Sequence, residues 1–298
     1  MSGSPQVSIC ICTYRRPRVA GTIRSVLAQQ GCDDVAAEIV VCDDDPAGSA
    51  RAAVTGFADE RWPVRYVASA AGNVAAARNV CLDAARGEWI AFIDDDENAA
   101  PDWLARLLVV QSLYDADVVK GFVRAVYPAD TPPAIRAADP YTRDYGVDGA
   151  PLTEVASGNV LFRRGLAAAN AVRFDVAFGL TGGEDTDFFH RYAATGARMV
   201  AARSAVVDEI VPPERVTWDY FRRRYLRMGQ TSGRRLGALP RARRASELAR
   251  ATVSVAAGWI YPALMPLNGR AGFVTFRKFW FSRGLFQGCR GIATEQMN

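Results

Sequence analysis

The sequence predicts an α/β fold, Rossmann-like, in which helices flank a mostly parallel sheet and a basic helical region follows at the C-terminus. Short apolar runs of strand length alternate with segments of helical periodicity between residues 7 and 126. Such alternation builds right-handed βαβ units around a parallel sheet. Polar residues follow three of these runs directly, at Thr13, at Asp44 and at Asp94 to Asp96. Ligands bind at this edge, because the carboxyl ends of parallel strands lie together there.

The first part of the chain supplies three strands and three helices. Val19, Ile23 and Val26 recur at helical spacing, which predicts a helix that Gly31 ends. Gly87 stands in the same place after a later helix. The expected elements are, in order, a strand at residues 7–12, this first helix, a strand at 38–42, a helix at 50–58, a strand at 64–67 and a helix at 73–85.

A further buried strand begins at Trp89 and stops at three adjacent carboxylates, Asp94, Asp95 and Asp96. Such a cluster is unfavourable without a bound cation, because mutual repulsion raises the pKa values of the carboxyls or opens the strand end. At strand spacing, Asp94 and Asp96 point the same way. Two hard oxygen ligands suit Mg²⁺ or Mn²⁺, and these ions in turn bind diphosphates. The alternative is a solvated acidic turn.

Beyond these acids the pattern is less regular. Residues 127–155 are rich in proline and lack periodicity, and a loop of that length in a compact domain is usually functional. The expected elements are a helix at 101–114, a strand at 118–126, a strand after Ser157-Gly158-Asn159, a glycine-containing loop at 178–183 that leads through Glu184 and Asp185 into a helix, and an arginine-rich helix at 217–229.

Charge divides the chain into two parts. From Arg215 onward the chain has 16 Lys and Arg against 3 Asp and Glu, whereas the part before it has 20 against 29. Basic tails suit anionic lipid headgroups, lipid diphosphates or nucleic acid. We therefore predict a binding and catalytic domain at residues 1–215 and a basic, partly apolar helical region at 216–298.

The basic region also contains residues 251–267, which carry no charge over 17 positions and include Pro262 and Pro266. Spanning a membrane takes about 20 apolar residues, so this segment predicts a helix at the membrane interface. A helix that simply packs on the main domain is the alternative. The six cysteines form no metal-binding spacing, and they predict buried free thiols of a reducing cytosol, while the short polar start predicts no signal peptide.

Five motifs then appear in one order: VSICICTYRRP, EIVVCDDDP, GNVAAARNVCLDAARGEWIAFIDDDE, SGNVLFRR and GGEDTDF. Together they resemble the family 2 glycosyltransferases, inverting enzymes of the GT-A fold, over about residues 5–215. Within that family the chain is similar to bacterial enzymes that build exopolysaccharide repeat units on a lipid carrier. The resemblance implies a hexosyltransferase that is cytoplasmic and peripheral to the anionic surface of the inner membrane. Its donor would be a nucleotide-diphosphate sugar, with a UDP-sugar favoured, and its acceptor a lipid-diphosphate-linked saccharide.

The resemblance also implies a donor-binding set at the first three motifs. Many relatives have proline where Cys12 stands, and Asp45-Pro46 replaces the Gly-Ser that usually follows the second strand. The implied contacts are Cys12, Thr13 and Tyr14 around the uridine, Asp44 at the uracil N3–H, Asn73 and Arg78 near the base and the diphosphate, and Asp94, Asp95 and Asp96 in the DxD motif, with Asp96 as the direct ligand of Mg²⁺ or Mn²⁺ and Asp94 as the second acid.

The last motif implies the general base. Asp185 matches that position, and Glu184 beside it serves as support or as the alternative base. A base opposite the leaving group removes the proton of the acceptor hydroxyl and makes the reaction a single displacement, while a metal ion neutralises the diphosphate that leaves. Many relatives also carry a late histidine ligand, where this chain offers Asp208 and Glu209.

Two other functions are compatible with parts of the sequence. A sugar nucleotidyltransferase would share the sheet and the paired acids, but the run from Tyr14 to Pro17 has arginines and none of the glycines of a phosphate loop. A nucleic-acid-binding protein would use the basic region, but no aromatic platform motif is present and the acidic N-terminal part opposes it. We therefore expect no nucleic-acid partner. The only histidine, His190, falls within a helix and is expected to be structural.

Overall fold

The computed structural model describes residues 4–57, 61–179, 182–236 and 240–291. The chain forms two compact units. The first comprises Met1–Ala125 and Thr142–Ile210, and the second comprises Val126–Tyr141 and Val211–Asn298. Apart from Val126, which ends the predicted strand 118–126, the segment 126–141 lies in the stretch for which the sequence predicts only a loop, and it belongs to the second unit. Neither the charge nor the hydrophobicity of this segment indicated that it belongs to the second unit.

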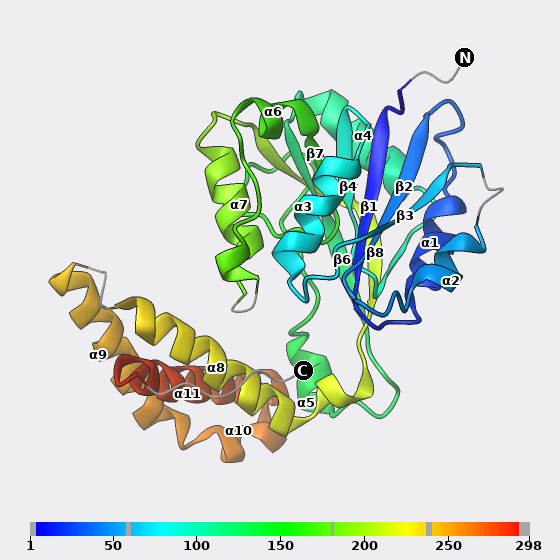
Figure 1. Cartoon of the computed structure of the whole chain (residues 1–298). Coiled ribbons are helices and arrows are strands. Elements are labelled where there is room, and N and C mark those ends of the chain that lie inside the picture. The colour runs from blue at the N-terminus through cyan, green and yellow to red at the C-terminus, as the bar shows by residue number, and fades with distance from the viewer. Residues whose placement is uncertain (1–3, 58–60, 180–181, 237–239, 292–298) are drawn as a thin grey trace. The chain divides into compact units, whose positions relative to one another are not determined.

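In the described part of the chain, one sheet of eight strands runs in the order β3-β2-β1-β4-β7-β6-β8-β5 (Figure 1). Its N-terminal strands follow the predicted ranges within two residues. The strands are β1 (Val7–Thr13), β2 (Ala37–Asp43), β3 (Val64–Ala68), β4 (Trp89–Phe92), β5 (Glu97–Ala99), β6 (Val118–Val126), β7 (Val160–Arg163) and β8 (Met199–Ile210).

The prediction of a mostly parallel sheet holds for one half of it. Strands β3, β2, β1 and β4 pair in parallel. Strand β7 pairs antiparallel with both β4 and β6, and β5 pairs antiparallel with β8. The sequence predicted neither β5 nor β8. In β8 the exposed Arg203 and the partly exposed Asp208 break the apolar run, so the strand does not read as a buried one.

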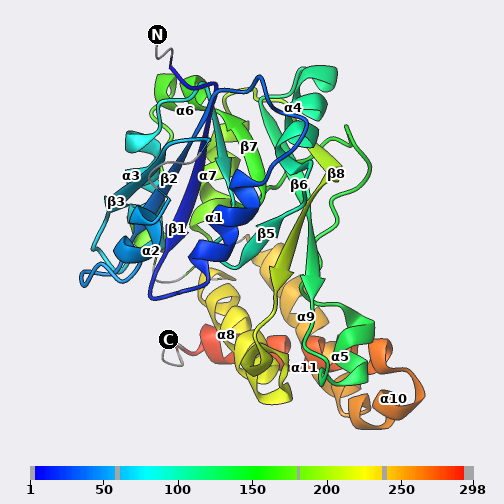
Figure 2. The ribbon, with the colours of Figure 1, turned by 90° about the vertical axis from the view of Figure 1, so that its right-hand side faces the viewer.

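Helices cover both faces of the sheet (Figure 2). Side chains alternate across each strand, so Ile9 and Ile11 of β1 enter a core under α1, α2 and α4, and Cys10 enters a second core under α3, α6 and α7. The helices of this unit are α1 (Val19–Leu27), α2 (Arg51–Thr55), α3 (Val74–Ala84), α4 (Trp103–Tyr114), α6 (Arg164–Ala169) and α7 (Glu184–Ala193). Of the predicted ranges, residue 58 and residues 180–181 lie outside the described residues. All six cysteines are free thiols as predicted, but the prediction that they are buried is wrong for Cys289, which is exposed, and Cys12 is only partly buried.

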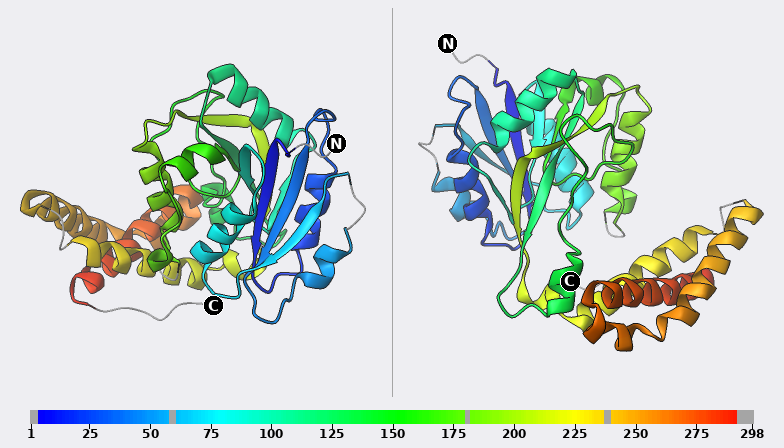
Figure 3. Two further views of the ribbon diagram at one scale, coloured as in Figure 1. Left: turned by 45° about the horizontal axis from the view of Figure 1, so that its top comes forward. Right: turned by 180° about the vertical axis from the view of Figure 1, so that it is seen from behind.

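The second unit is helical. It contains α5 (Pro133–Ala138), α8 (Trp218–Arg235), α9 (Arg241–Gly258), α10 (Tyr261–Leu267) and α11 (Gly269–Cys289). Helix α11 packs against the other four (Figure 3). Glycines bring the backbones of α8 and α11 together: a Cβ atom on Gly229 would lie 2.0 Å from the Phe281 carbonyl oxygen, and one on Gly284 equally near that of Leu226. Any larger residue would therefore separate the two helices.

The uncharged stretch 251–267 is divided between two of these helices. It forms the end of α9, a turn, and all of α10. Trp259, Ile260 and Leu267 of this stretch are exposed by 71%, 54% and 81%, so it does not simply bury itself as the core of the unit. Within the residues that the structure describes, no helix is long and apolar enough to cross a membrane.

Candidate functional site

The structure brings the three predicted polar strand ends to one edge of the sheet. Strand β1 pairs in parallel with both β2 and β4, and its last residue, Thr13, stands opposite Asp43. The backbone N–H of Asp44 donates to the carbonyl oxygen of Thr13 at 2.9 Å, and Ile93 N–H donates to the carbonyl of Cys10 at 3.2 Å. The acids that follow β2 and β4 therefore flank the end of β1.

The three acids after β4 lie in a turn. Strand β4 ends at Phe92 and β5 begins at Glu97, so the strand-spacing argument for Asp94 and Asp96 does not apply. Asp95 is the most buried of the three, and it accepts hydrogen bonds from the Thr13 hydroxyl and from Arg16, both at 2.7 Å. The same Arg16 nitrogen donates to Asp96 at 2.8 Å. Burial raises the pKa of Asp95 to about 6, against the opposing effect of Arg16.

Asp94 faces a different set of groups. A Cβ atom placed on Gly158 would lie 2.6 Å from its Oδ2 and 3.1 Å from Glu97 Oε1. Glu97 also accepts a hydrogen bond from the Asp94 backbone N–H at 3.0 Å. The missing side chain at Gly158 thus makes room for both carboxylates. The carboxylate of Asp94 forms no hydrogen bond or ion pair with any residue that the structure describes.

A buried ionic cluster, which the sequence did not predict, supports this turn. Glu97 and Lys120 have no solvent exposure. Burial raises the pKa of Glu97 and lowers that of Lys120, and Lys120 donates a hydrogen bond to the carbonyl of Gly158. Arg143 completes the cluster, at 2.8 Å from Glu209 and 3.4 Å from Glu97. The sequence does contain one indication of this cluster, since Lys120 is one of only two lysines and lies in an apolar strand.

The donor-binding candidates at and after the first strands differ in their burial and in how many hydrogen bonds they already form within the protein. Asp44 is buried, and one of its carboxylate oxygens accepts the Ala71 N–H at 3.0 Å. Asn73 caps α3 by accepting from two backbone N–H groups and also donates to the Val176 carbonyl. The thiols of Cys12 and Cys81 lie 3.7 Å apart, whereas Tyr14 is 46% exposed.

Arg78 links α3 to the start of α7. It is buried and forms an ion pair with Glu184 at 2.6 Å. Burial by itself lowers the pKa of Arg78, but the charges of Asp94, Glu184 and Asp185 outweigh it, and the net shift is upward. The positive charge of Arg78 is therefore favoured by Asp94, after β4, and by Glu184 and Asp185, at the start of α7.

The two acids at the start of α7 are not equivalent. One oxygen of Glu184 is held by Arg78, and the other is buried without a hydrogen-bond partner among the described residues. Asp185 is only partly buried, and its Oδ1 accepts from the N–H of Thr186 at 2.7 Å. The helix N-terminus stabilises both negative charges. Asp185 is thus the more accessible of the two carboxylates, and it forms no ion pair within the described residues.

The late acids do not form a metal site on their own. Asp208 is bound by Arg124 at 2.6 Å, and Glu209 by Arg143. His190 is exposed on α7. Among the described residues, no group of three or more His, Cys, Asp or Glu side chains could hold a metal ion. Mg²⁺ is commonly bound through one or two carboxylates and the phosphates of a substrate. The Asp94 carboxylate fits a metal of that kind, because it forms no hydrogen bond or ion pair with a described residue, whereas Asp96 would have to exchange its ion pair with Arg16 for the metal.

Comparison with known proteins identifies relatives of this chain. The sequence model of glycosyl transferase family 2 matches residues 8–169. The succinoglycan biosynthesis protein ExoM of Rhizobium meliloti is 38% identical over 77% of this chain and 75% of its own length. The UDP-Glc:alpha-D-GlcNAc-diphosphoundecaprenol beta-1,3-glucosyltransferase WfgD of Escherichia coli is 36% identical over 35% of this chain and 39% of its own length.

Solved structures match the fold. A crystal structure of S. aureus TarS in complex with UDP has a TM-score of 0.55 and 15% identity, and the match covers 96% of this chain and 92% of that one. The complex of the same protein with UDP-GlcNAc has a TM-score of 0.54 and 14% identity, with the same coverage. The likeness at this identity concerns the fold, and it confirms the GT-A architecture with a helical C-terminal region.

Proposed function

Because the chain belongs to glycosyl transferase family 2 and is a glycosyltransferase, we propose that it moves a sugar from a UDP-sugar to a hydroxyl of a lipid-linked saccharide. The observation that carries the proposal is the buried ion pair of Arg78 with Glu184 at 2.6 Å, which joins α3 to the start of α7, where Asp185 follows. The donor diphosphate needs a positive charge beside it, and the attacking hydroxyl needs a carboxylate that accepts its proton. Arg78 and Asp185 are the candidates for these two roles. The nucleotidyltransferase and nucleic-acid-binding alternatives are not supported by the family match.

The donor site is assigned to the end of β1 and its neighbours. Asp44 has one carboxylate oxygen engaged with Ala71, and we assign the other to the uracil N3–H. Cys12, Thr13 and Tyr14 line the uridine, and Asp95 orders that edge through Thr13 and Arg16. Asn73 contributes by fixing the start of α3, since its side chain is used as a helix cap.

The leaving diphosphate is negatively charged, and Arg78 provides a buried positive charge beside it. Asp96 and Asp94 would hold Mg²⁺ or Mn²⁺, and the ion would add charge neutralisation of the diphosphate when bound. The cluster of Glu97, Lys120 and Arg143 supports the turn of Asp94 to Asp96. Glu97 accepts the Asp94 N–H, Lys120 donates to the Gly158 carbonyl, and Arg143 forms an ion pair with Glu97.

The general base is assigned to Asp185. Proton removal needs a carboxylate that can reach the acceptor hydroxyl, and Asp185 is more accessible than Glu184. Glu184 holds Arg78 in position instead. Attack from the side opposite the diphosphate makes the reaction a single displacement with inversion.

The acceptor and its location follow from the relatives and from the second unit. ExoM is named for succinoglycan biosynthesis and WfgD for a diphosphoundecaprenol-linked substrate. The basic helical unit exposes Trp259, Ile260 and Leu267. We therefore propose that this unit, from about residue 216 onward, holds the enzyme peripherally on an anionic inner-membrane surface, where such an acceptor is found.

The catalytic assignment is tested with Asp96→Ala and Asp185→Asn. Asp96→Ala should abolish the Mn²⁺-dependent part of UDP binding in isothermal titration. Asp185→Asn should retain UDP binding but lower UDP release from the best UDP-sugar by roughly 10²–10⁴-fold. Asp187→Asn on the same helix is the control, since Asp187 pairs with Arg191. Unchanged turnover in Asp185→Asn would remove the base assignment.

The membrane assignment is tested by flotation of the full chain with vesicles. Each surface arginine contributes about 1 kcal/mol near an anionic leaflet, so the protein should float with anionic vesicles, less at high salt, and not with zwitterionic ones. A truncated chain that ends at residue 215 cannot serve as the control without the basic region, because α5 would lose its packing against α11. A full chain that stays in solution beside anionic vesicles at low salt contradicts the assignment.

A further inference from the structure

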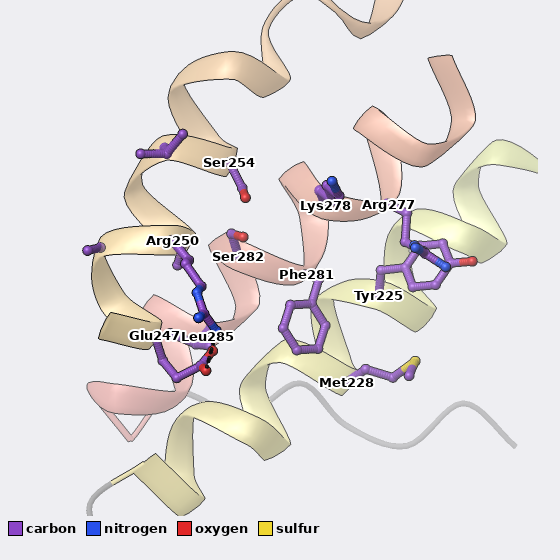
Figure 4. A pocket seen from close by; sticks show the side chains of 13 residues that line it. Tyr225, Met228, Glu247, Arg250, Ser254, Arg277, Lys278, Phe281, Ser282 and Leu285 are labelled. Atoms are coloured by element: carbon purple, nitrogen blue, oxygen red, sulfur yellow. Dashed lines mark hydrogen bonds and ion pairs between the residues drawn. The ribbon is translucent and has the colours of Figure 1, made fainter. Parts of the chain in front are cut away.

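A cavity of about 800 Å³ lies between α8, α9 and α11 of the second unit (Figure 4). Small-molecule sites typically enclose about 300–1,000 Å³. The cavity is lined by residues of all three helices, and Phe281 of α11 and Ser254 of α9 are among them. It lies within a single unit, and it is distinct from the strand-end site.

The cavity wall is mainly apolar. Ala251 and Leu285 line it and belong to a small buried core, and Phe281 packs against that core. Met228 and Val253 also line it but are 46% and 67% exposed, so they lie where the cavity opens to solvent. An apolar chain that entered there would cover side chains that otherwise face water.

An apolar stripe continues from the opening. Val253, Ala257 and Ile260 follow at intervals of four and three residues, so they share one side of α9 and the turn after it. All three are exposed. The stripe extends the apolar wall beyond the cavity, which suits a chain longer than the cavity itself.

The polar edge of the cavity is cationic. Arg250 pairs with Glu247 at 3.1 Å. Arg277 and Lys278 line the cavity and are exposed, and neither forms an ion pair with any residue in the described ranges. Adjacent cations beside an apolar cavity are complementary to a phosphate joined to a hydrocarbon chain.

We propose that this cavity binds the hydrocarbon end of an isoprenoid phosphate lipid, with its phosphate at Arg277 and Lys278. The inference rests on the proposed lipid-linked acceptor and names the part of the protein that holds its tail. The apolar wall selects the chain, and the two cations select the phosphate. A free phosphate would satisfy only the cations, and a neutral hydrocarbon only the wall.

The test compares three probes against the full-length protein by isothermal titration: geranylgeranyl diphosphate below its micelle concentration, inorganic diphosphate and geranylgeraniol. Geranylgeranyl diphosphate should bind at least about tenfold more tightly than either partial probe. Ser254→Trp fills the cavity and should weaken that binding at least about tenfold. Thr252→Trp is its control, because Thr252 is exposed on the same helix and does not line the cavity.

The charge requirement has its own variant pair. Arg277→Ala with Lys278→Ala should weaken binding of geranylgeranyl diphosphate, whereas Arg270→Ala with Arg290→Ala should not. The second pair removes the same charge from exposed positions of α11 and its end, outside the cavity lining. Melting temperatures of all variants show that they are folded.

Several results would overturn the proposal. These are no saturable binding by the wild type, equal binding of inorganic diphosphate, or full binding by Ser254→Trp. A lower particle mass of Ser254→Trp in light scattering, without lipid binding by the wild type, would mean that a second copy covers the cavity. UDP binding with Mn²⁺ is measured in the same samples. Normal UDP binding without lipid binding rejects this inference alone, whereas the proposed function fails on Asp96→Ala and Asp185→Asn.

Discussion

Replacing Gly158 with alanine perturbs the turn of Asp94 without removing any charged group. Gly158 is buried at the start of β7 and has no left-handed backbone angle, so alanine brings only its methyl group. That group would lie 2.6 Å from Asp94 Oδ2 and 3.1 Å from Glu97 Oε1. Ordinary contact begins at 3.4 Å, so the Asp94 carboxylate must move by about 0.8 Å.

This displacement sets the expected effect on catalysis. A misplacement of about 1 Å in an active site lowers the rate roughly 10²-fold, so Gly158→Ala should lower turnover by about 10- to 100-fold. Asp94 is short and Glu97 is buried, which leaves the two carboxylates little freedom to relax elsewhere. The free energy of unfolding should change by less than the activation free energy that corresponds to the loss of turnover, since no hydrogen bond is removed.

The assay is UDP release from the UDP-sugar that the wild type uses best, titrated with Mn²⁺, beside thermal unfolding. Gly165→Ala is the matched control. Gly165 lies in α6, and its Cβ would meet no atom within 4 Å, so that variant should keep full turnover and gain stability by about 0.4–1 kcal/mol. A folded Gly158→Ala protein with wild-type turnover and Mn²⁺ dependence would falsify the role given to Asp94.

Three further substitutions test the supporting structure in urea unfolding experiments. Arg78→Met should destabilise the fold by about 3–5 kcal/mol, because it leaves Glu184 buried and unpaired; a change below about 1 kcal/mol would contradict a buried pair. Asn159→Ala should cost about 2–4 kcal/mol, because the Asn159 amide binds the Trp103 indole N–H and two backbone carbonyls. Burial raises the pKa of Glu38, but its hydrogen bonds lower it further, and the net shift is downward. Its contribution is therefore present above the unfolded pKa of about 4.5 and lost as pH falls through the lower folded value, so Glu38→Gln should destabilise at pH 7 by about 1–3 kcal/mol and by less at pH 3. An equal loss at both values would exclude a role for the charge.

The parallel half of the sheet could be predicted from the sequence because its signals are local. Apolar runs such as that of β1 are buried on both faces, and each ends at a polar residue. Since parallel strands share an edge, Thr13, Asp44 and the acids after β4 had to lie near one another. The amphipathic spacing of α1 and the cap at Asn73 are likewise written in a few neighbouring residues.

Other features depend on pairings between distant segments. The second half of strand β8 alternates buried and partly buried residues and carries charges, so its place between β6 and β5 is decided by partners far along the chain. The same holds for the cluster of Glu97, Lys120 and Arg143, whose charges come from separate parts of the sequence and are buried only after the strands pair.

Local sequence therefore determined the strand ends that build the site, and tertiary structure decided how its acids are used. Arg78 is far from Glu184 in the chain, yet their ion pair in the folded protein leaves Asp185 as the accessible carboxylate. The cavity of the second unit likewise needs both α8 and α9 to pack on α11, at a distance that Gly229 and Gly284 set for α8. No periodicity shows such a cavity, because it is space left between helices after their backbones meet.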